Sequence, residues 1–341
     1  VNRALVLVSG THIECQNSKG VVAVATSGSE ITQDDITRVI EAARAISLPS
    51  SKEIIHVIPR YFTVDGQTGV RDPIGMTGVR LEVDTHIITG AATSLRNVAK
   101  CVQEVGVDVE GLVFSGLAAA QSVLTETEKE LGVILVDMGA GTTNIAIFVD
   151  GALSHSAVLP VGAKNITNDL AIGLRVSLET AEKIKLILSQ PRKILEEPEG
   201  QKKHSKDEED TLNLAELGVA EELKSVSKKT LIEGIANPRI KEIINIVKIE
   251  IVRSGLGGRT PAGVVLTGGG GETFGISEIA KHELAMPVRV GYPVGATGLV
   301  DEISTPQFAS TLGLVLYGAK LTEESQTRLP LVGRVEIKGL V

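Results

Sequence analysis

The sequence has no tryptophan and few other aromatic residues. Three Tyr and five Phe occur among 341 residues, an aromatic content of 2%. Proteins that bind single-stranded nucleic acid stack bases on aromatic side chains, and binding to a phosphate backbone needs a basic surface. This chain instead carries 34 Lys and Arg against 42 Asp and Glu, a formal net charge of −8. We therefore expect no nucleic acid partner.

Cysteines and long apolar runs are scarce as well. The two cysteines, Cys15 and Cys101, are too few for a disulfide framework or a metal cluster, and the six histidines show no metal-ligand spacing. No apolar run approaches the roughly 20 residues that cross a bilayer. The apolar start at residues 1–8 is followed by no signal-cleavage pattern. These absences predict a reducing, cytoplasmic setting.

Strand and helix patterns alternate along the chain, which predicts an α/β fold. Short apolar runs that favour strands occur at residues 21–24, 54–58, 112–114, 133–136 and 264–266. Helical patterns occur at residues 36–43, 95–105, 117–124, 163–188, 238–252 and 276–284. The charged run at residues 190–210 predicts a solvated loop.

Local signals set several element boundaries. Thr32 is expected to cap a helix, with Asp35 in the capping-box position, and Gly106 is expected to end the helix at 95–105. The Asp-Gly pairs at 65–66 and 150–151 predict turns, the second within a β-hairpin. Residues expected on buried faces include Leu95, Val98, Ala99, Val102 and Val105 of that helix, and Val79, Leu81 and Val83 of a strand.

The sharpest chemical signal is the run Asp137-Met138-Gly139-Ala140-Gly141-Thr142-Thr143-Asn144, directly after a buried strand. Glycines let the backbone turn tightly, and consecutive N–H groups in such a turn form an anion-binding concavity. Thr142 and Thr143 add hydroxyl groups, and Asp137 would hold Mg²⁺ through water beside a phosphate. We interpret the run as a phosphate loop. A glycine-rich hairpin with a capping Asp is the alternative.

A second glycine run, Gly268-Gly269-Gly270-Gly271, lies between the strand at 264–266 and the helix at 276–284. Four glycines carry a conformational-entropy cost, so a ligand or a packing reason is expected. A nucleotide base or ribose against this backbone is one reason, and a tight strand-to-helix crossover is the other. The run is not a dinucleotide fingerprint, because Thr273 stands where a third spaced glycine would be required.

Together the two motifs outline the second half of the actin-like ATPase fold, and the chain resembles the FtsA family of actin-like bacterial cell-division proteins. Similarity to that family's inserted subdomain lies at residues 53–59, 64–67 and 72–78. It continues at residues 151–155, 167–174 and 308–314, so the resemblance covers nearly the whole chain.

The resemblance implies an α/β actin-like two-lobe ATPase fold with the FtsA-type inserted subdomain, the first lobe lacking its N-terminal strands. The units expected from it are the inserted subdomain (1–81), the remainder of the first lobe (82–127), the second-lobe core (128–175 and 255–322, the latter with the C-terminal helix), a small second-lobe subdomain (176–254) and a tail (323–341).

The resemblance also implies that ATP and Mg²⁺ bind between the lobes. By motif match, Asp137, Gly139, Gly141, Thr142 and Thr143 fall on the second phosphate loop, with Asp137 directing the metal. Gly268, Gly269 and Gly270 fall on the adenosine loop, and Gly162 is expected near the ribose or phosphates. Arg239, Lys241 and Glu242 fall on a helix that approaches adenine, although a solvated helix face is the alternative for each.

Gln121 is a separate candidate, for catalysis. It lies in an alanine-rich segment that resembles actin's interlobe helix, where a glutamine positions the attacking water. The alternative is a polar residue on a structural helix.

The partners implied by the resemblance are FtsZ, other divisome proteins and further copies of the chain in a filament. Residues 176–254 would receive the acidic FtsZ tail, with Lys241, Lys248 or Arg253 as a basic contact. The family works at the cytoplasmic face of the membrane at the division site.

Two parts of the family pattern are not found in this sequence. No Asp-x-Gly-Thr first phosphate loop precedes Val1, and no amphipathic membrane helix follows residue 335. We therefore expect weak or no ATP binding and hydrolysis by the chain as given, and no co-sedimentation with liposomes.

Two other functions remain open for a chain of this fold. An actin-fold kinase would need an acid–base residue facing a substrate hydroxyl, and we find no such constellation. A pilus-assembly relative would act as a pure binding module. We expect an adaptor and filament subunit rather than an enzyme.

Overall fold

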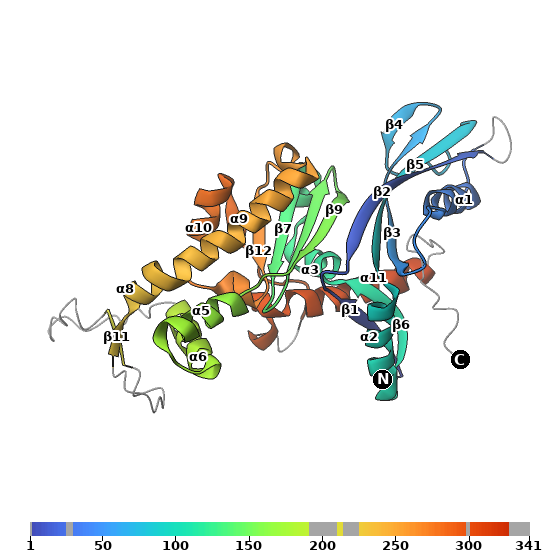
Figure 1. The fold of residues 1–341 in the computed structure, drawn as a ribbon. Helices are drawn as coiled ribbons and strands as arrows, with labels where there is room; N and C mark the ends of the chain where they lie inside the picture. The colour runs from blue at the N-terminus through green and yellow to red at the C-terminus, as the bar shows by residue number, and fades with distance from the viewer. Residues whose placement is uncertain (1, 25–29, 191–209, 214–224, 298–300, 327–341) are drawn as a thin grey trace.

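A computed structural model of the 341-residue chain describes residues 2–24, 30–190, 210–213, 225–297 and 301–326. The predicted loop at 190–210 lies almost entirely outside the described residues. The described helices and strands alternate, so the α/β prediction is confirmed (Figure 1).

The central sheet has five strands in the order β13-β12-β7-β8-β9. Their bounds are β7 Val133–Met138, β8 Thr143–Val149, β9 Ala152–Leu159, β12 Val264–Thr267 and β13 Val288–Val290. β12 runs parallel to β7 and β13, whereas β7, β8 and β9 are antiparallel. The hairpin predicted at 150–151 joins β8 to β9, with Asp150 at φ 53° and Gly151 at φ 79°.

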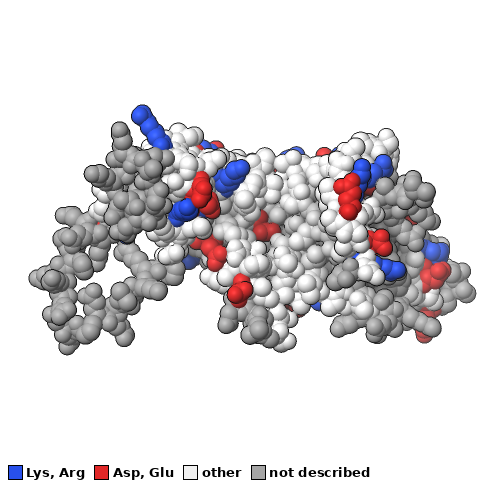
Figure 2. All heavy atoms as spheres, turned by 90° about the horizontal axis from the view of Figure 1, so that it is seen from below, with Lys and Arg blue, Asp and Glu red and all other residues white. Residues whose placement is uncertain are grey.

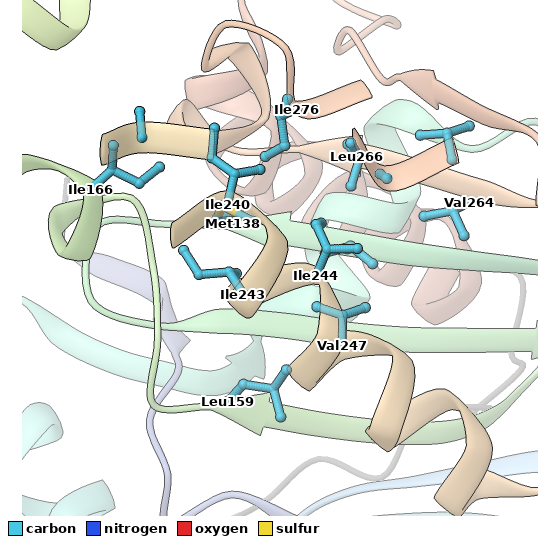
Figure 3. Close-up of a cluster of buried hydrophobic side chains, with 14 of the residues drawn as sticks. Met138, Leu159, Ile166, Ile240, Ile243, Ile244, Val247, Val264, Leu266 and Ile276 are labelled. Carbon is cyan, nitrogen blue, oxygen red and sulfur yellow. The ribbon is translucent and has the colours of Figure 1, made fainter. Parts of the chain in front are cut away.

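Both faces of this sheet are covered, which explains the continuous apolar run of β7. One face packs against helices α5 (Lys164–Leu174), α6 (Leu178–Ser189), α9 (Asn237–Ser254) and α10 (Ile276–Leu284). Figure 3 shows Ile240, Ile243, Ile244 and Val247 of α9 in this cluster, with Leu266 of β12. The other face packs against α3 (Ser115–Val123) and α11 (Ala309–Gln326).

A second, four-stranded antiparallel sheet has the order β2-β5-β3-β4. Its strands are β2 Glu14–Ala23, β3 Lys52–Val64, β4 Gln67–Val70 and β5 Arg80–Ala91. Helix α1 (Gln33–Arg44) begins at the capping box that was predicted, because Thr32 N donates to Asp35 Oδ2 at 2.9 Å and Asp35 N donates back to Thr32 Oγ1. At Gly20 an added Cβ would lie 2.1 Å from the Val39 carbonyl oxygen, so the glycine lets α1 approach β2.

A third, smaller sheet pairs β1 (Arg3–Val8) with β6 (Asp108–Phe114) in parallel. Helix α2 (Ala92–Glu104) connects β5 to β6. β1 therefore pairs with β6, although residues 1–81 were expected to form one unit.

The shorter elements are α4 (Glu126–Leu131), α8 (Lys228–Leu231), β10 (Thr211–Asn213), β11 (Ser225–Ser227), the π-helix η2 (Ile232–Ala236) and the 3₁₀ turns η3 (Gly257–Arg259), η4 (Gly269–Glu272), η5 (Asp301–Ile303) and η6 (Pro306–Phe308).

Polar contacts join the four-stranded sheet to β9. His86 Nε2 lies 3.0 Å from Ser156 Oγ, and His86 Nδ1 lies 2.7 Å from Asn17 Oδ1. Arg60 Nε donates to Ser154 Oγ at 3.2 Å. Burial lowers the pKa of His86 to about 3, so this histidine is neutral at physiological pH. These hydrogen bonds therefore hold the four-stranded sheet against β9, at the edge of the five-stranded sheet.

Two predicted buried faces differ from the structure. In α2, Leu95 and Ala99 are buried, but Val98 is 37% exposed and Val105 is 77% exposed. Val79 is 51% exposed and precedes β5, whereas Leu81 and Val83 are buried within it. A helical apolar pattern wider than the available core leaves its outer residues in solvent. Gly106 does follow the helix as its C′ residue, at φ 81°.

The described surface shows no single-charge region on the face drawn in Figure 2, where acidic and basic side chains lie in small mixed groups. Among the described residues, no helix combines the length and apolar character that crossing a bilayer requires.

Candidate nucleotide-binding site

The two glycine runs leave the central sheet side by side. In the ladder between β7 and β12, Asp137 is the register partner of Thr267, so both strands end at the same edge. Gly268 then turns at φ 77°, and a Cβ added there would lie 2.4 Å from Asp137 Oδ1 and 2.5 Å from the Met138 carbonyl oxygen. Only a glycine fits a left-handed backbone at such a close approach. The two runs therefore converge at one edge of the central sheet.

Part of each run lines one open pocket of about 580 Å³. The predicted site residues Asp137, Gly141, Thr142, Thr143 and Gly268 are not among the described residues that line it. Gly139 and Ala140 form part of its wall, and Gly269 and Gly270 form another part. The other residues that line it are Ala163, Lys164, Thr167, Asn168, Leu178, Glu179, Glu182, Lys185, Leu186, Ser189, Glu272, Thr273 and Gln307. Its size suits a small-molecule ligand.

The loop after β7 is held by backbone contacts with the start of α5. Gly139 N donates to the Thr142 carbonyl oxygen at 2.9 Å, closing the turn. Ala163 N donates to Gly139 O and Lys164 N to Ala140 O, each at 2.9 Å. At Gly162 an added Cβ would lie 2.5 and 2.6 Å from the carbonyl oxygens of Ala140 and Gly139. Gly162 therefore packs against the loop and is not among the residues that line the pocket.

The two threonines of the loop have different surroundings. Thr143 is fully buried, and its Oγ1 donates to the Val161 carbonyl oxygen at 2.8 Å. This hydroxyl fixes β8 to the segment before α5 and is not free for a phosphate. Thr142 is partly exposed, with its Oγ1 3.3 Å from Ser9 Oγ. Of the two, Thr142 has the more accessible hydroxyl group, although it is not among the described residues that line the pocket.

Asp137 is a buried carboxylate without a basic partner among the described residues. It is 6% exposed, and its Oδ2 accepts hydrogen bonds from Ser310 Oγ at 2.9 Å and Asn144 Nδ2 at 3.2 Å. Burial raises its pKa, although these two hydrogen bonds oppose the shift. Oxygen ligands and negative charge suit Mg²⁺. No cluster of three His, Cys, Asp or Glu side chains able to hold a metal occurs in the described residues. A metal here would therefore be held through water and a ligand's phosphates.

Helix α6 contributes a group that the sequence analysis missed. Lys185 Nζ donates to Glu182 Oε2 at 2.8 Å and to Thr167 Oγ1 at 3.1 Å, and Thr167 Oγ1 donates to Glu182 Oε2 at 2.5 Å. Burial raises the pKa of Glu182, but the hydrogen bonds from Lys185 and Thr167 outweigh it and the net shift is downward. The result is an ionised, hydrogen-bonded pair in the pocket wall. A Glu and a Lys three positions apart are common on helices, so no sequence signal distinguished them.

The predicted adenine contacts on α9 lie outside the pocket lining. Arg239 Nε donates to Asp169 Oδ2 at 2.6 Å, and its Nη1 donates to Glu242 Oε2 at 2.6 Å. The hydrogen bond to Asp169 is the main cause that raises the pKa of Arg239. Neither Arg239 nor Glu242 lines the pocket, and nor does Lys241. The Arg239–Asp169 pair instead ties α9 to α5, next to Asn168, which does line the pocket.

Gln121 also lies away from the pocket lining. It is on α3, and its Oε1 accepts a hydrogen bond from Lys320 Nζ of α11 at 2.8 Å. The structure therefore gives Gln121 a hydrogen-bond partner on α11 and does not place it among the residues that line the pocket.

The predicted partner contacts share one helix. Lys248 and Arg253 are exposed on α9, where Lys248 Nζ donates to the Glu283 carbonyl oxygen at 2.7 Å and Arg253 lies 3.8 Å from Glu250. Ile249 and Val252 are 66% and 72% exposed on the same helix. Lys241 is exposed two turns earlier.

Comparisons with known proteins agree with this geometry. Residues 10–89 match the model of the SHS2 domain inserted in FtsA, and residues 134–313 match the model of cell division protein FtsA. The chain is 39% identical to cell division protein FtsA of Pseudomonas aeruginosa over 329 residues, covering 93% of this chain and 73% of that protein. It is 36% identical to FtsA of Bacillus subtilis over 321 residues, covering 94% and 69%.

Solved structures show the fold. A PilM–PilN type IV pilus biogenesis complex matches at a TM-score of 0.58 and 16% identity, covering 93% of this chain and 80% of that chain. MreB5 of Spiroplasma citri bound to ADP matches at a TM-score of 0.50 and 19% identity, covering 69% and 67%. The four-stranded sheet with α1 is the SHS2 insert, and the fold is actin-like. The chain belongs to the FtsA family of cell-division proteins.

Proposed function

We propose that this chain is a nucleotide-responsive subunit of an actin-like filament and an adaptor that links FtsZ to the membrane at the division site. Membership of the FtsA family supports the cell-division role. The observation that carries the nucleotide part is the convergence of the loop after β7 and the glycine run after β12 on one pocket.

In this proposal the pocket holds ATP or ADP with Mg²⁺. The backbone N–H groups of residues 140–142 face the phosphates, as anion-binding turns do, whereas that of Gly139 donates to the Thr142 carbonyl oxygen. Gly269, Gly270 and the apolar side chains of Leu178 and Leu186 flank the nucleoside. Glu182 and Lys185 offer an acceptor and a donor for ribose hydroxyl groups. The ADP bound to MreB5, which shares this fold, supports the assignment.

Asp137 fits the metal in this proposal. Its buried carboxylate lies at the end of β7 beside the Gly268 turn, and no basic side chain among the described residues pairs with it. Mg²⁺ would neutralise charge between this carboxylate and the phosphates. Arg239, Glu242 and Gln121 stay predictions as ligand or catalytic residues, to be tested by their effect on affinity and on hydrolysis.

The FtsZ contact is proposed at the exposed face of α9. Lys241, Lys248 and Arg253 supply positive charge for an acidic tail, and Ile249 and Val252 supply apolar area between these charges. The small subdomain that would carry this contact is proposed as residues 176–254. The other domain boundaries, at residues 81, 127, 175 and 322, are proposals as well.

Binding assays test the proposal. Calorimetric titration of the chain with ADP and Mg²⁺ is expected to show weak but saturable binding at one site, because the first phosphate loop of the family pattern is not found in this sequence. An immobilised FtsZ tail peptide is expected to retain the chain, and a pilus-assembly peptide is not. Retention by the pilus peptide alone, or phosphoryl transfer to a small-molecule hydroxyl, would overturn the assignment.

A further inference from the structure

Lys164 occupies an unusual position in the pocket. It is the first residue of α5 and lines the pocket together with Gly139 and Ala140. Its backbone N–H donates to the Ala140 carbonyl oxygen at 2.9 Å, which anchors the root of the side chain on the phosphate loop. The side chain is exposed and makes no hydrogen bond or ion pair with another described residue.

The helix itself does not favour a lysine at this position. The N-terminus of a helix carries a partial positive charge, so basic residues are stabilising in the last turn and unfavourable in the first. Helix α5 has no acidic residue in its first turn, and its N-cap residue Ala163 makes no side-chain hydrogen bond. Positive charge from the helix end and from Lys164 is therefore concentrated next to the loop. A local preference broken in this way is typical of a functional position.

The charged side chains that line the pocket also indicate that Lys164 is available to bind an anion. Lys185 is already neutralised by Glu182, and Glu179 is paired with Lys183 at 2.8 Å. Glu272 lines the pocket, and burial raises its pKa. Among the described residues that line the pocket, Lys164 is the basic side chain left for an incoming anion.

We propose that Lys164 binds the outer phosphates of the nucleotide and makes the site select by phosphate number, for tri- and diphosphates over the monophosphate. This inference rests on the proposed nucleotide function. Lys164 lies at the phosphate end, because Gly139 and Ala140 are its neighbours, whereas the nucleoside end is formed by α6 and the run at 269–273. Charge-assisted hydrogen bonds from an ammonium to phosphate are among the stronger polar contacts in proteins.

The test compares Lys164→Met with Lys281→Met, which removes the same charge from the exposed last turn of α10, away from the pocket lining. Dissociation constants for ATP, ADP and AMP are measured by calorimetry on the full chain with Mg²⁺. Lys164→Met is expected to weaken ATP binding about tenfold, ADP binding by a smaller factor and AMP binding hardly at all. Lys281→Met is expected to match the wild type for all three. Inorganic tripolyphosphate is expected to displace ADP from the wild type more effectively than from Lys164→Met.

Thermal unfolding of the free variant provides a second readout. Lys164→Met is expected to melt no lower than the wild type, because it removes a charge that the helix end disfavours. An equal loss of affinity for ATP, ADP and AMP, or no loss for ATP, would overturn the role of Lys164 while leaving the nucleotide site in place. A wild type that binds none of the three would instead overturn the nucleotide function itself, and the role of Lys164 with it.

Discussion

Gly162→Ala tests how the loop at residues 139–142 is held in place. An alanine Cβ at this position would lie 2.5 Å from the Ala140 carbonyl oxygen and 2.6 Å from that of Gly139, much closer than real Cβ contacts allow. Either α5 or the loop must then move, and both backbone hydrogen bonds between them, from Ala163 and Lys164, are strained or lost. At about 1 kcal/mol for each bond, and with the packing lost beside them, we expect the free energy of unfolding to fall by roughly 2–3 kcal/mol.

Gly141→Ala is the matched control in the same loop. Nothing lies within 4 Å of a Cβ at Gly141, and its backbone is outside the left-handed region. Alanine there should leave stability unchanged or raise it by about 0.5 kcal/mol, because it restricts the unfolded chain. Urea titration followed by far-ultraviolet circular dichroism suits a chain without tryptophan. Equal unfolding free energies for the two variants would show that the close approach at Gly162 does not hold the loop in place. Unchanged ADP affinity in a destabilised Gly162→Ala would show that the loop position does not matter for the ligand.

Three further predictions concern titration, the metal and the partner surface. His56 Nε2 accepts the hydrogen bond from Phe114 N at 3.0 Å, and burial lowers its pKa from 6.5 to about 4. The folded protein therefore binds fewer protons than the unfolded chain between these values, so stability is full above pH 6.5 and is lost as the pH falls to about 4, by up to about 3 kcal/mol. The free energy of unfolding, measured by denaturation at several pH values in this window, should depend less steeply on pH for His56→Gln than for the wild type. His282→Gln, at an exposed histidine, should keep the wild-type dependence. Asp137→Asn should raise the unfolding free energy at neutral pH, because burial disfavours the charged carboxylate, and should weaken ADP binding in the presence of Mg²⁺; a variant that binds as well as the wild type would argue against the metal role. Arg253→Glu on α9 should weaken FtsZ-tail binding about tenfold, whereas Lys281→Glu on α10 should not, and an equal effect of both would indicate unspecific charge attraction.

Features set by local chemistry could be predicted from the sequence. The capping box at Thr32, the hairpin at 150–151 and the helix end at Gly106 depend on residues close together in the chain, and each is found in the structure. These features require no knowledge of distant packing. The meeting of the two glycine runs does require it, because it depends on the ladder between β7 and β12, and it was expected through the resemblance to the FtsA family.

Features set by tertiary packing could not be predicted in the same way. The apolar pattern of α2 included Val98 and Val105, but which residues are buried depends on how far the neighbouring sheet extends. No sequence signal showed that residue 162 must be a glycine because two carbonyl groups of the loop pack against it. The hydroxyl of Thr143 was expected to face a phosphate, whereas the segment before α5 offers it the Val161 carbonyl group.

The pocket group formed by Glu182, Lys185 and Thr167 illustrates the same limit. The Lys185–Glu182 pair forms within α6, but the hydrogen bonds of Thr167 with Glu182 and Lys185 exist only once α6 packs against α5. Arg239 was predicted to contact the ligand, but its guanidinium group forms an ion pair with Asp169 that the sequence did not reveal.

Photocrosslinking with an azido derivative of ADP, followed by mapping of the modified peptides, would locate the nucleotide on the chain. We expect crosslinks in α6 and in the run at 269–273, both suppressed by excess unlabelled ADP with Mg²⁺. Crosslinks confined to other parts of the chain, or crosslinks in these segments that unlabelled ADP does not suppress, would contradict a nucleotide site between the two glycine runs.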